Sequence, residues 1–319
     1  MSCMSQVHQS HLIMGGFVVV SGIAAYSTYK LVTLKSHHQR EAHKENVYET
    51  AKYLNEYLLF HFGSPEEVLQ LDFGPKNALE NFPKRCAEEC LAHALDGADI
   101  PSRALDIGCA TGRSSFELAR RYREVVGIDF SHSFVAACEQ LKVAGTIDYN
   151  RQDEGDLTTQ LKAVVDPAID RSRTRFQQGD ACNLPLDLGQ FGCVLAANLI
   201  CRLPTPFDFL NRLKSLVAPG GVLVITSPYT WLTEFTPKST WLGGYKDKDG
   251  TPVMGFQTLQ NSLRGSFDLV THKDMPYIIR ETARENQLGI AHCTVWRRKT
   301  DISVPMSEPR KARDGMVLR

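Results

Sequence analysis

The sequence predicts an α/β fold: an open, mostly parallel sheet of seven strands, closed at one edge by an antiparallel hairpin. An apolar strand runs directly into a glycine-bracketed turn and a helix between residues 104 and 121. Four successive apolar strands each end in Asp or Asn, which is typical of parallel sheets that bind a ligand at their carboxyl edge. Two strand candidates near the end of the chain, 267–271 and 291–297, supply the antiparallel pair.

The segments before the glycine-bracketed turn are predicted to be helical. Residues 48–62 interleave apolar and polar positions at helical spacing, and Gly63-Ser-Pro65 ends that helix. A second helix, 82–94, leads into the first strand. Two cysteines and a histidine share one face of it, but no matching ligand pair is found, so we expect buried thiols and no metal site.

Helices and strands alternate after the turn. In chain order the prediction is a helix at 113–121, a strand at 125–129, a third strand ending at 179–181, a fourth at 193–198, a helix at 206–216, a turn at Pro219-Gly-Gly221 and a fifth strand at 222–226. The polar stretch 148–175 is predicted to be an insertion with a short helix that folds over the active site.

Composition predicts one large folded domain, 46–299, between an N-terminal extension, 1–45, and a disordered basic tail, 300–319. With 43% hydrophobic residues, a domain of about 250 residues can bury a sizeable core. The 36 basic and 36 acidic residues balance, and no basic stripe is present, which argues against nucleic acid as a partner. Nine cysteines scattered through apolar segments indicate a reducing compartment.

The extension contains an uncharged apolar segment, 12–29, near the lower limit of the ~17 to 25 residues that span a bilayer. Lys30, Lys35 and Arg40 follow it and no basic residue precedes it, so the charge bias predicts a cytoplasmic domain anchored by this segment. A targeting peptide and a poorly ordered extension remain open alternatives.

The turn itself predicts the cofactor. Asp106 ends the strand, and Gly108 and Gly112 remove Cβ atoms where the backbone must turn tightly and approach a ligand. The order Asp-x-Gly-x-x-x-Gly differs from the Gly-x-Gly-x-x-Gly pattern that faces a pyrophosphate, and a carboxylate would repel one. S-adenosylmethionine, which is cationic and free of phosphate, fits, and we expect Cys109 and Ala110 to contact it as well.

Other strand ends extend this site. Asp129 lies 23 residues after Asp106, close to the ~20-residue offset at which an acid meets ribose hydroxyls. The third strand ends at Asp180-Ala181, where the acid is placed to accept from the adenine amino group, and the fourth ends at Asn198. Each acid taken singly is also compatible with a helix cap or a turn.

Several unusual segments narrow the family. They are 57–63 (YLLFHFG), 82–87 (FPKRCA), 179–185 (GDACNLP), 196–204 (AANLICRLP), 227–237 (SPYTWLTEFTP), 241–244 (WLGG) and 294–298 (TVWRR). Over about 48–298 the chain resembles the mercaptohistidine N-methyltransferases of ovothiol biosynthesis, like the C-terminal domain of the bifunctional ovothiol synthases. The resemblance implies a Rossmann-like, class I S-adenosylmethionine-dependent methyltransferase that methylates an imidazole nitrogen of thiohistidine to give ovothiol.

In many such relatives the domain follows an iron-dependent sulfoxide synthase that installs the sulfur. Here an apolar segment stands in that place, so the resemblance implies a separate sulfoxide synthase that supplies thiohistidine.

Substrate binding should matter more than acid catalysis, because methyl transfer is an in-line displacement by a neutral nitrogen, and the substrate thiolate must be turned away. The carboxylate of the amino-acid substrate is expected to bind Arg, and its ammonium group is expected to bind a carboxylate or an aromatic face. The predicted catalytic residues are His61, Tyr229 and Arg202, and the predicted substrate-binding residues are Glu56, Tyr57, Arg202, Trp231, Glu234 and Arg280. Arg202, directly after the fourth strand, is the strongest candidate; packing, capping or a surface ion pair is the alternative for each.

Two other functions stay open at this point. A membrane-tethered methyltransferase acting on a lipid or quinone is motivated by segment 12–29, and it would need an apolar channel. A non-catalytic S-adenosylmethionine-binding module would retain the loop without the reaction.

Overall fold

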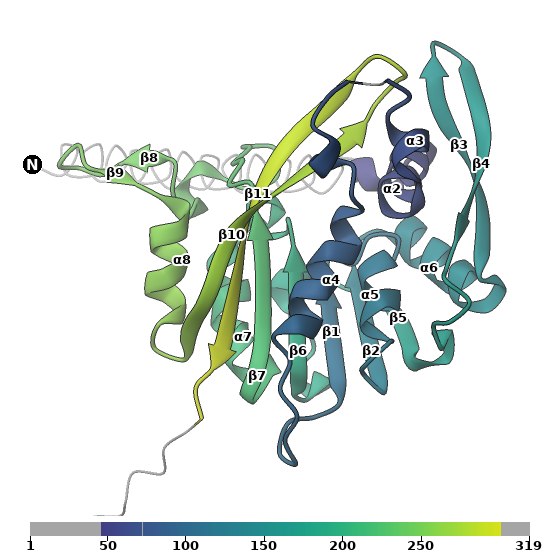
Figure 1. The fold of residues 1–319 in the computed structure, drawn as a ribbon. Helices are drawn as coiled ribbons and strands as arrows, with labels where there is room; N and C mark the ends of the chain where they lie inside the picture. Colours follow the sequence, from purple (N-terminus) through teal and green to yellow (C-terminus); the bar gives the residue numbers. More distant parts are fainter. Residues whose placement is uncertain (1–45, 72, 301–319) are drawn as a thin grey trace, which may run out of the picture. The chain divides into compact units, whose positions relative to one another are not determined.

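A computed structural model describes residues 46–71 and 73–300, in which a compact unit starts at Tyr48. Its main sheet has seven strands in the order β10-β11-β7-β6-β1-β2-β5 (Figure 1). In chain order these strands are β1 (Arg103–Ile107), β2 (Glu124–Asp129), β5 (Thr174–Gln178), β6 (Phe191–Ala197), β7 (Val217–Ser227), β10 (Phe267–Arg280) and β11 (Asn286–Arg298). Neighbouring strands are parallel except that β11 runs antiparallel to both β7 and β10, which confirms the predicted fold class.

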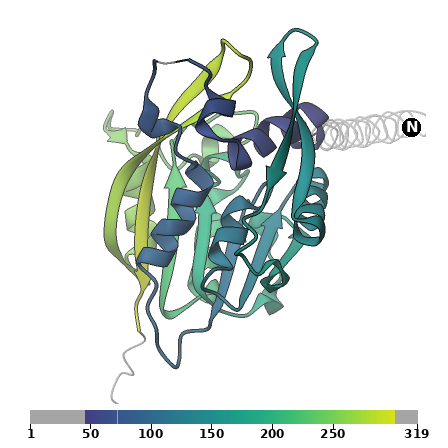
Figure 2. The same cartoon turned by 45° about the vertical axis from the view of Figure 1, so that its right-hand side comes forward.

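Helices cover both faces of the sheet (Figures 1 and 2). The α-helices are α2 (Ala51–Phe62), α3 (Pro65–Val68), α4 (Phe82–Ala92), α5 (Arg113–Leu118), α6 (His132–Ala144), α7 (Pro206–Leu216) and α8 (Gly255–Leu263). Alternate residues of β1 enter different cores: Ala104 packs with α4, α5 and α6, whereas Leu105 packs with α7 and α8. Burial on both faces explains why these strands are continuous apolar runs in the sequence.

Two hairpins and the helices α2 and α3 form a cap that extends beyond the carboxyl edge of the sheet (Figure 2). One hairpin is β3 (Thr146–Glu154) and β4 (Leu157–Val164), and the other is formed by the distal ends of β10 and β11. The predicted short helix within 148–175 is therefore wrong apart from a three-residue 3-10 turn. Tyr149 and Arg151 are buried while Asn150 between them is exposed, which is a strand period.

Short elements complete the described chain. They are the 3-10 helices η1 (Val47–Glu49), η2 (Lys76–Ala78), η3 (Arg171–Arg173), η4 (Ala181–Asn183), η5 (Leu186–Leu188), η6 (Ile200–Arg202) and η7 (Lys238–Thr240), and the strands β8 (Tyr245–Lys246) and β9 (Pro252–Val253). Pro219-Gly-Gly221, predicted as a turn, lies inside β7, where Gly220 keeps a φ of 75°. Cys86 and Cys90 are fully buried in α4, as expected for thiols that pack in the core.

Nothing in 46–71 or 73–300 is a helix both long and apolar enough to span a bilayer. The predicted anchor segment 12–29, the rest of 1–45 and residues 301–319 of the predicted tail lie outside the described residues.

Gly112 offers a test of the loop packing. Its φ is +84°, and a Cβ there would lie 2.9 Å from the Cys138 sulfur and 3.1 Å from Phe176. Gly250 has a similar φ of +80° with no atom within 4 Å of its Cβ position. We expect Gly112→Ala to lower the free energy of unfolding by about 2 to 4 kcal/mol and Gly250→Ala by about 1 kcal/mol, as measured by urea denaturation. Equal losses would show that φ alone, and not the contact with α6 and β5, makes glycine necessary.

Candidate cofactor and substrate site

The loop after β1 makes a tight left-handed turn. The Gly108 N–H donates to the Ile128 carbonyl at 2.8 Å, and a Cβ on Gly108 would lie 3.0 Å from the Leu199 side chain. Ala110 has a φ of 46°, an unfavourable conformation for a residue with a Cβ, and its N–H donates to Asp129 Oδ2 at 2.8 Å. Cys109 is buried. The loop is thus held between β2 and the segment that follows β6.

Asp106 lies beneath this loop instead of presenting its charge at the surface of the edge. It is fully buried, and its Oδ2 accepts hydrogen bonds from the hydroxyls of Ser114 and Ser115, both at 2.7 Å. Its Oδ1 is buried without a partner. Burial raises the pKa of Asp106 to about 6. One oxygen therefore fixes the start of α5, and the other is left for a hydrogen-bond donor such as a ligand ammonium.

The other predicted cofactor residues end neighbouring strands at the same edge. Asp129 accepts from the backbone N–H groups of Ala110 and Ser131, and burial raises its pKa. Asp180 is exposed and caps η4, with Ala181 buried beside it. Asn198 has a φ of 52°, and its Oδ1 accepts from the Thr226 hydroxyl at 3.0 Å. Three carboxylates on consecutive strands, one with a free buried oxygen, fit a cationic ligand without phosphate.

Helix α2 crosses the loop and brings two predicted residues to it. The Thr111 hydroxyl donates to the Tyr57 carbonyl at 3.4 Å. His61, one turn later, is 5% exposed, and its Nδ1 is buried without a partner. Burial, reinforced by Arg113, lowers the pKa of His61 to about 3. His61 is thus a neutral, buried polar group, and it is poorly suited to exchange protons with solvent.

The structure also brings Arg202 and Tyr57 together. Arg202 Nη1 donates to the Thr230 carbonyl at 2.8 Å, and its guanidinium lies 5.1 Å from the centre of the Phe235 ring. Tyr48 stacks on Phe235 and meets Tyr57 edge-on at 5.9 Å. Burial raises the pKa of Tyr48, and the nearby Arg202 opposes the rise. The sequence analysis did not select Tyr48 or Phe235, although each lies in a segment that contains several aromatic residues, 48–62 and 227–237.

The remaining candidates are more dispersed. Tyr229 follows β7 and lies 3.0 Å from His292 Nδ1 through its hydroxyl. Trp231 stacks on Trp241 and keeps a buried, unpaired Nε1. Glu234 is exposed. Glu56 is half-buried, and burial followed by repulsion from Glu281 raises its pKa.

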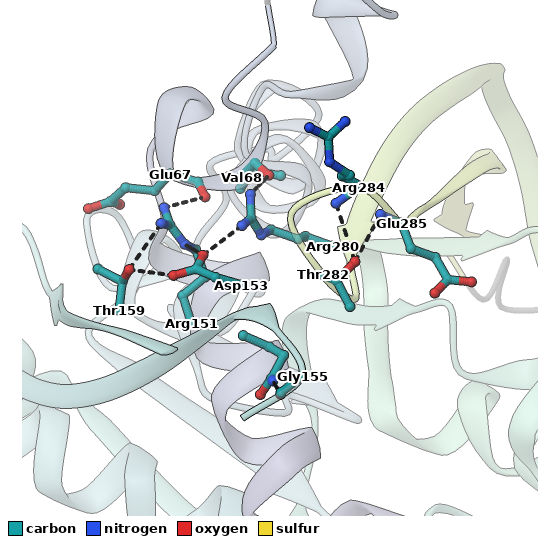
Figure 3. Close-up of polar contacts among 11 residues, drawn as sticks. Glu67, Val68, Arg151, Asp153, Gly155, Thr159, Arg280, Thr282, Arg284 and Glu285 are labelled. Carbon is teal, nitrogen blue, oxygen red and sulfur yellow. Dashed lines mark hydrogen bonds and ion pairs between the residues drawn. The ribbon is translucent and has the colours of Figure 1, made fainter. Parts of the chain in front are cut away.

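Arg280 has a structural role in place of the predicted substrate contact (Figure 3). It is 3% exposed, and it donates to Asp153 Oδ1 at 2.8 Å and to the Val68 carbonyl at 3.2 Å. Arg151 donates to the same Asp153 oxygen at 2.9 Å. The Arg151–Asp153–Arg280 cluster thus joins β3, β10 and the end of α3.

Strand order, the glycine loop and the row of acids at the carboxyl edge together define a class I, S-adenosylmethionine-dependent methyltransferase fold. Residues 105–225 match the family model for the methyltransferase domain. The chain accordingly carries a domain of this superfamily, and S-adenosylmethionine is its cofactor.

Similar proteins act on varied substrates. A probable chloroplastic tocopherol O-methyltransferase of Oryza sativa subsp. japonica is 27% identical over 150 residues, which are 46% of this chain and 34% of the relative. Norajmaline N-methyltransferase of Rauvolfia serpentina is 26% identical over 133 residues, 41% of this chain and 38% of the relative. The chain thus spans little more than a third of these two relatives. The structure of N-methyltransferase NodS of Bradyrhizobium japonicum with S-adenosyl-L-homocysteine aligns with a TM-score of 0.42 at 15% identity, covering 77% of this chain and 98% of NodS.

Asp129 can be tested against a carboxylate at the other end of its strand. We expect Asp129→Asn to weaken S-adenosylmethionine binding about 10- to 100-fold in calorimetry, because a charged acceptor for ribose hydroxyls is lost. Glu124→Gln, at the first residue of β2, should leave the affinity unchanged. Equal affinity of the Asn variant and the unaltered protein would remove Asp129 from the cofactor site.

The Arg151–Asp153–Arg280 cluster is testable by stability. Asp153→Ala leaves two buried guanidinium groups without their shared carboxylate, so we expect thermal or urea unfolding to show a loss of about 2 kcal/mol. Asp96→Ala removes an exposed partner of Arg121 and should change stability little. A neutral effect of Asp153→Ala would mean that the cluster does not hold the two hairpins together.

Proposed function

We propose that this chain is an N-methyltransferase that transfers the methyl group of S-adenosylmethionine to an imidazole nitrogen of thiohistidine, giving ovothiol. One observation carries the proposal: three segments that carry the family resemblance, 57–63, 196–204 and 227–237, are distant in sequence and converge around Arg202 beside the cofactor loop. Adjacent parallel strands β6 and β7 bring 196–204 and 227–237 to this edge, and helix α2 adds 57–63 from outside the sheet.

The chemistry explains what such a site must do. A bond forms between the ring nitrogen and the methyl carbon as the bond from carbon to sulfur breaks, so the three atoms must lie in line. The carbonyls of Thr230 and Cys201 orient the Arg202 guanidinium, which suits the carboxylate of an amino-acid substrate. Aromatic rings of Tyr48, Tyr57 and Phe235 are suited to stack on a heterocycle and exclude water.

Two further proposals accompany this assignment, the second of which rests on the charges that flank segment 12–29. Thiohistidine would reach this chain from a separate sulfoxide synthase, and the catalytic domain would work in the cytoplasm, anchored by segment 12–29. Neither point is needed for the reaction itself.

The direct test uses the full chain with S-adenosylmethionine and, in parallel, thiohistidine, histidine or ergothioneine. Mass spectrometry should detect the addition of one methyl group to thiohistidine, and NMR should place it on a ring nitrogen. Preferred turnover of histidine would overturn the assignment. Methylation of lipid or quinone instead would favour the membrane-tethered alternative, and cofactor binding with no methylated product would favour the non-catalytic one.

Arg202 gives a residue-level prediction. We expect Arg202→Ala to raise the KM for thiohistidine about 10- to 100-fold, through loss of a charge-assisted hydrogen bond, with S-adenosylmethionine affinity retained. Steady-state kinetics and calorimetry measure the two effects separately. The exposed Arg264 of the α8 C-terminus supplies a control, since Arg264→Ala should alter neither. An unchanged KM would exclude Arg202 as the carboxylate contact.

A further inference from the structure

A chain of hydrogen bonds connects the site to the surface on the side opposite the cofactor acids. The Tyr229 hydroxyl lies 3.0 Å from His292 Nδ1, and His292 Nε2 lies 3.0 Å from His272 Nδ1. Tyr229 and His292 are half-buried, whereas His272 is exposed. With both rings neutral, two tautomers of His292 satisfy both contacts; in the one used below, the Tyr229 hydroxyl donates to Nδ1, and the Nε2–H of His292 donates to His272 Nδ1.

The sheet register builds this arrangement. His292 of β11 pairs with Ser227, the last residue of β7, and with Asp274 of β10, so its side chain stands at the carboxyl edge. Tyr229 comes two residues after Ser227 and has a φ of 51°. Phe256 of α8 meets the His292 ring edge-on at 4.5 Å and shields it.

Tyr229 has a positive φ, as do Ala110 in the loop after β1 and Asn198 after β6. Among the described residues, Ala110, Asn198 and Tyr229 are the non-glycine positions with positive φ, and each lies within three residues of the end of a strand at the carboxyl edge. Such strain persists where the surrounding structure fixes it, and it is enriched at functional sites. A Cβ on Gly255 would lie 2.8 Å from the Tyr229 ring, so α8 leaves that ring little room to move.

Local charges keep the relay neutral. Burial lowers the pKa of His292, His272 lowers it further, and Asp274 opposes the change, while Phe256 of the covering helix adds no charge. Burial raises the pKa of Tyr229, and Cys201 and Cys293 add to the rise, so the phenol retains its proton. Both groups are therefore neutral near neutral pH, and His292 has one ring nitrogen without hydrogen that can accept from the Tyr229 hydroxyl.

We propose that Tyr229, His292 and His272 form a proton relay that carries the ring N–H proton of the substrate to solvent during methyl transfer. This inference rests on the proposed function. In an imidazole the nitrogen that bears hydrogen keeps its lone pair in the ring π system, so the other nitrogen attacks, and the N–H proton must leave for the methylated ring to be neutral. The bond from nitrogen to carbon forms, the bond from carbon to sulfur breaks, and S-adenosylhomocysteine leaves uncharged.

The proton follows a balanced path. It passes from the ring nitrogen to the Tyr229 oxygen while the hydroxyl hydrogen moves to His292 Nδ1. His292 then gives its Nε2 proton to His272 Nδ1, and His272 releases a proton to water from its exposed ring. In this path Tyr229 touches the substrate, and the two histidines act through it.

The kinetic test compares Tyr229→Phe and His292→Asn with His93→Asn, a histidine at the C-terminus of α4, in the full chain. We expect kcat to fall about 100-fold in the first two, with KM and cofactor affinity retained, and no change in the third. In the unaltered protein kcat should fall as pH is lowered through the pKa of His292, because the protonated ring cannot accept. His292→Asn should remove that limb of the profile.

Outcomes separate the two proposals. If the unaltered protein methylates thiohistidine and His292→Asn keeps its kcat and acid limb, the relay is overturned and the proposed function stands. If no thiohistidine is methylated, the proposed function fails, and nitrogen-15 NMR of the histidine rings still decides the relay geometry. That spectrum should show His292 protonated at Nε2, with its pKa shifted in Tyr229→Phe; protonation at Nδ1 would overturn the relay.

Discussion

The carboxyl edge of the sheet depends on the two hydrogen bonds that the Asp129 carboxylate accepts from the backbone. Its two oxygens accept from the backbone of Ala110 in the β1 turn and of Ser131 at the start of α6, so one side chain shapes two adjacent turns. Burial raises the pKa of this carboxyl group, and the backbone hydrogen bonds partly offset the cost of removing its charge from water. If Asp129 accepts from the ribose hydroxyls as proposed, the two backbone contacts already orient its carboxylate.

The two hairpins of the cap are joined by ion pairs of Arg151 and Arg280 with Asp153. The hairpin ends of β3–β4 and β10–β11 come from distant parts of the sequence, and they meet through Asp153, whose carbonyl also accepts from Ala283 (Figures 2 and 3). A buried charged cluster adds little net stability, but it penalises any register that separates its members. Helix α2, which carries Tyr57 and His61, contacts both hairpins and is positioned over the loop by them.

The sequence predicted what depends on local pattern. Strands buried on both faces, the loop from Gly108 to Gly112 and the seven-strand count all follow from runs and spacings along the chain. The register between strands that are distant in sequence could not be predicted from such patterns. Arg280 was expected at the substrate because its type suits a carboxylate, yet its direction is set by a bulge at Asp153 in a different hairpin. His292 carried no signal, since its place at the edge follows from pairing with Ser227 and Asp274.

The order of strands also separates the charges that the proposed reaction must handle. Asp106 lies near the end of β1, Asp129 ends β2 and Asp180 follows β5, so all three lie on the half of the edge that the proposed cofactor site occupies. The relay lies on β7, β11 and β10, the other half, and Arg202 follows the central β6. A proton released among these acids would meet carboxylates that can retain it. Release on the opposite half, through an exposed histidine, avoids that competition, whereas His61 is buried, with a pKa of about 3, and is poorly placed to pass a proton to solvent.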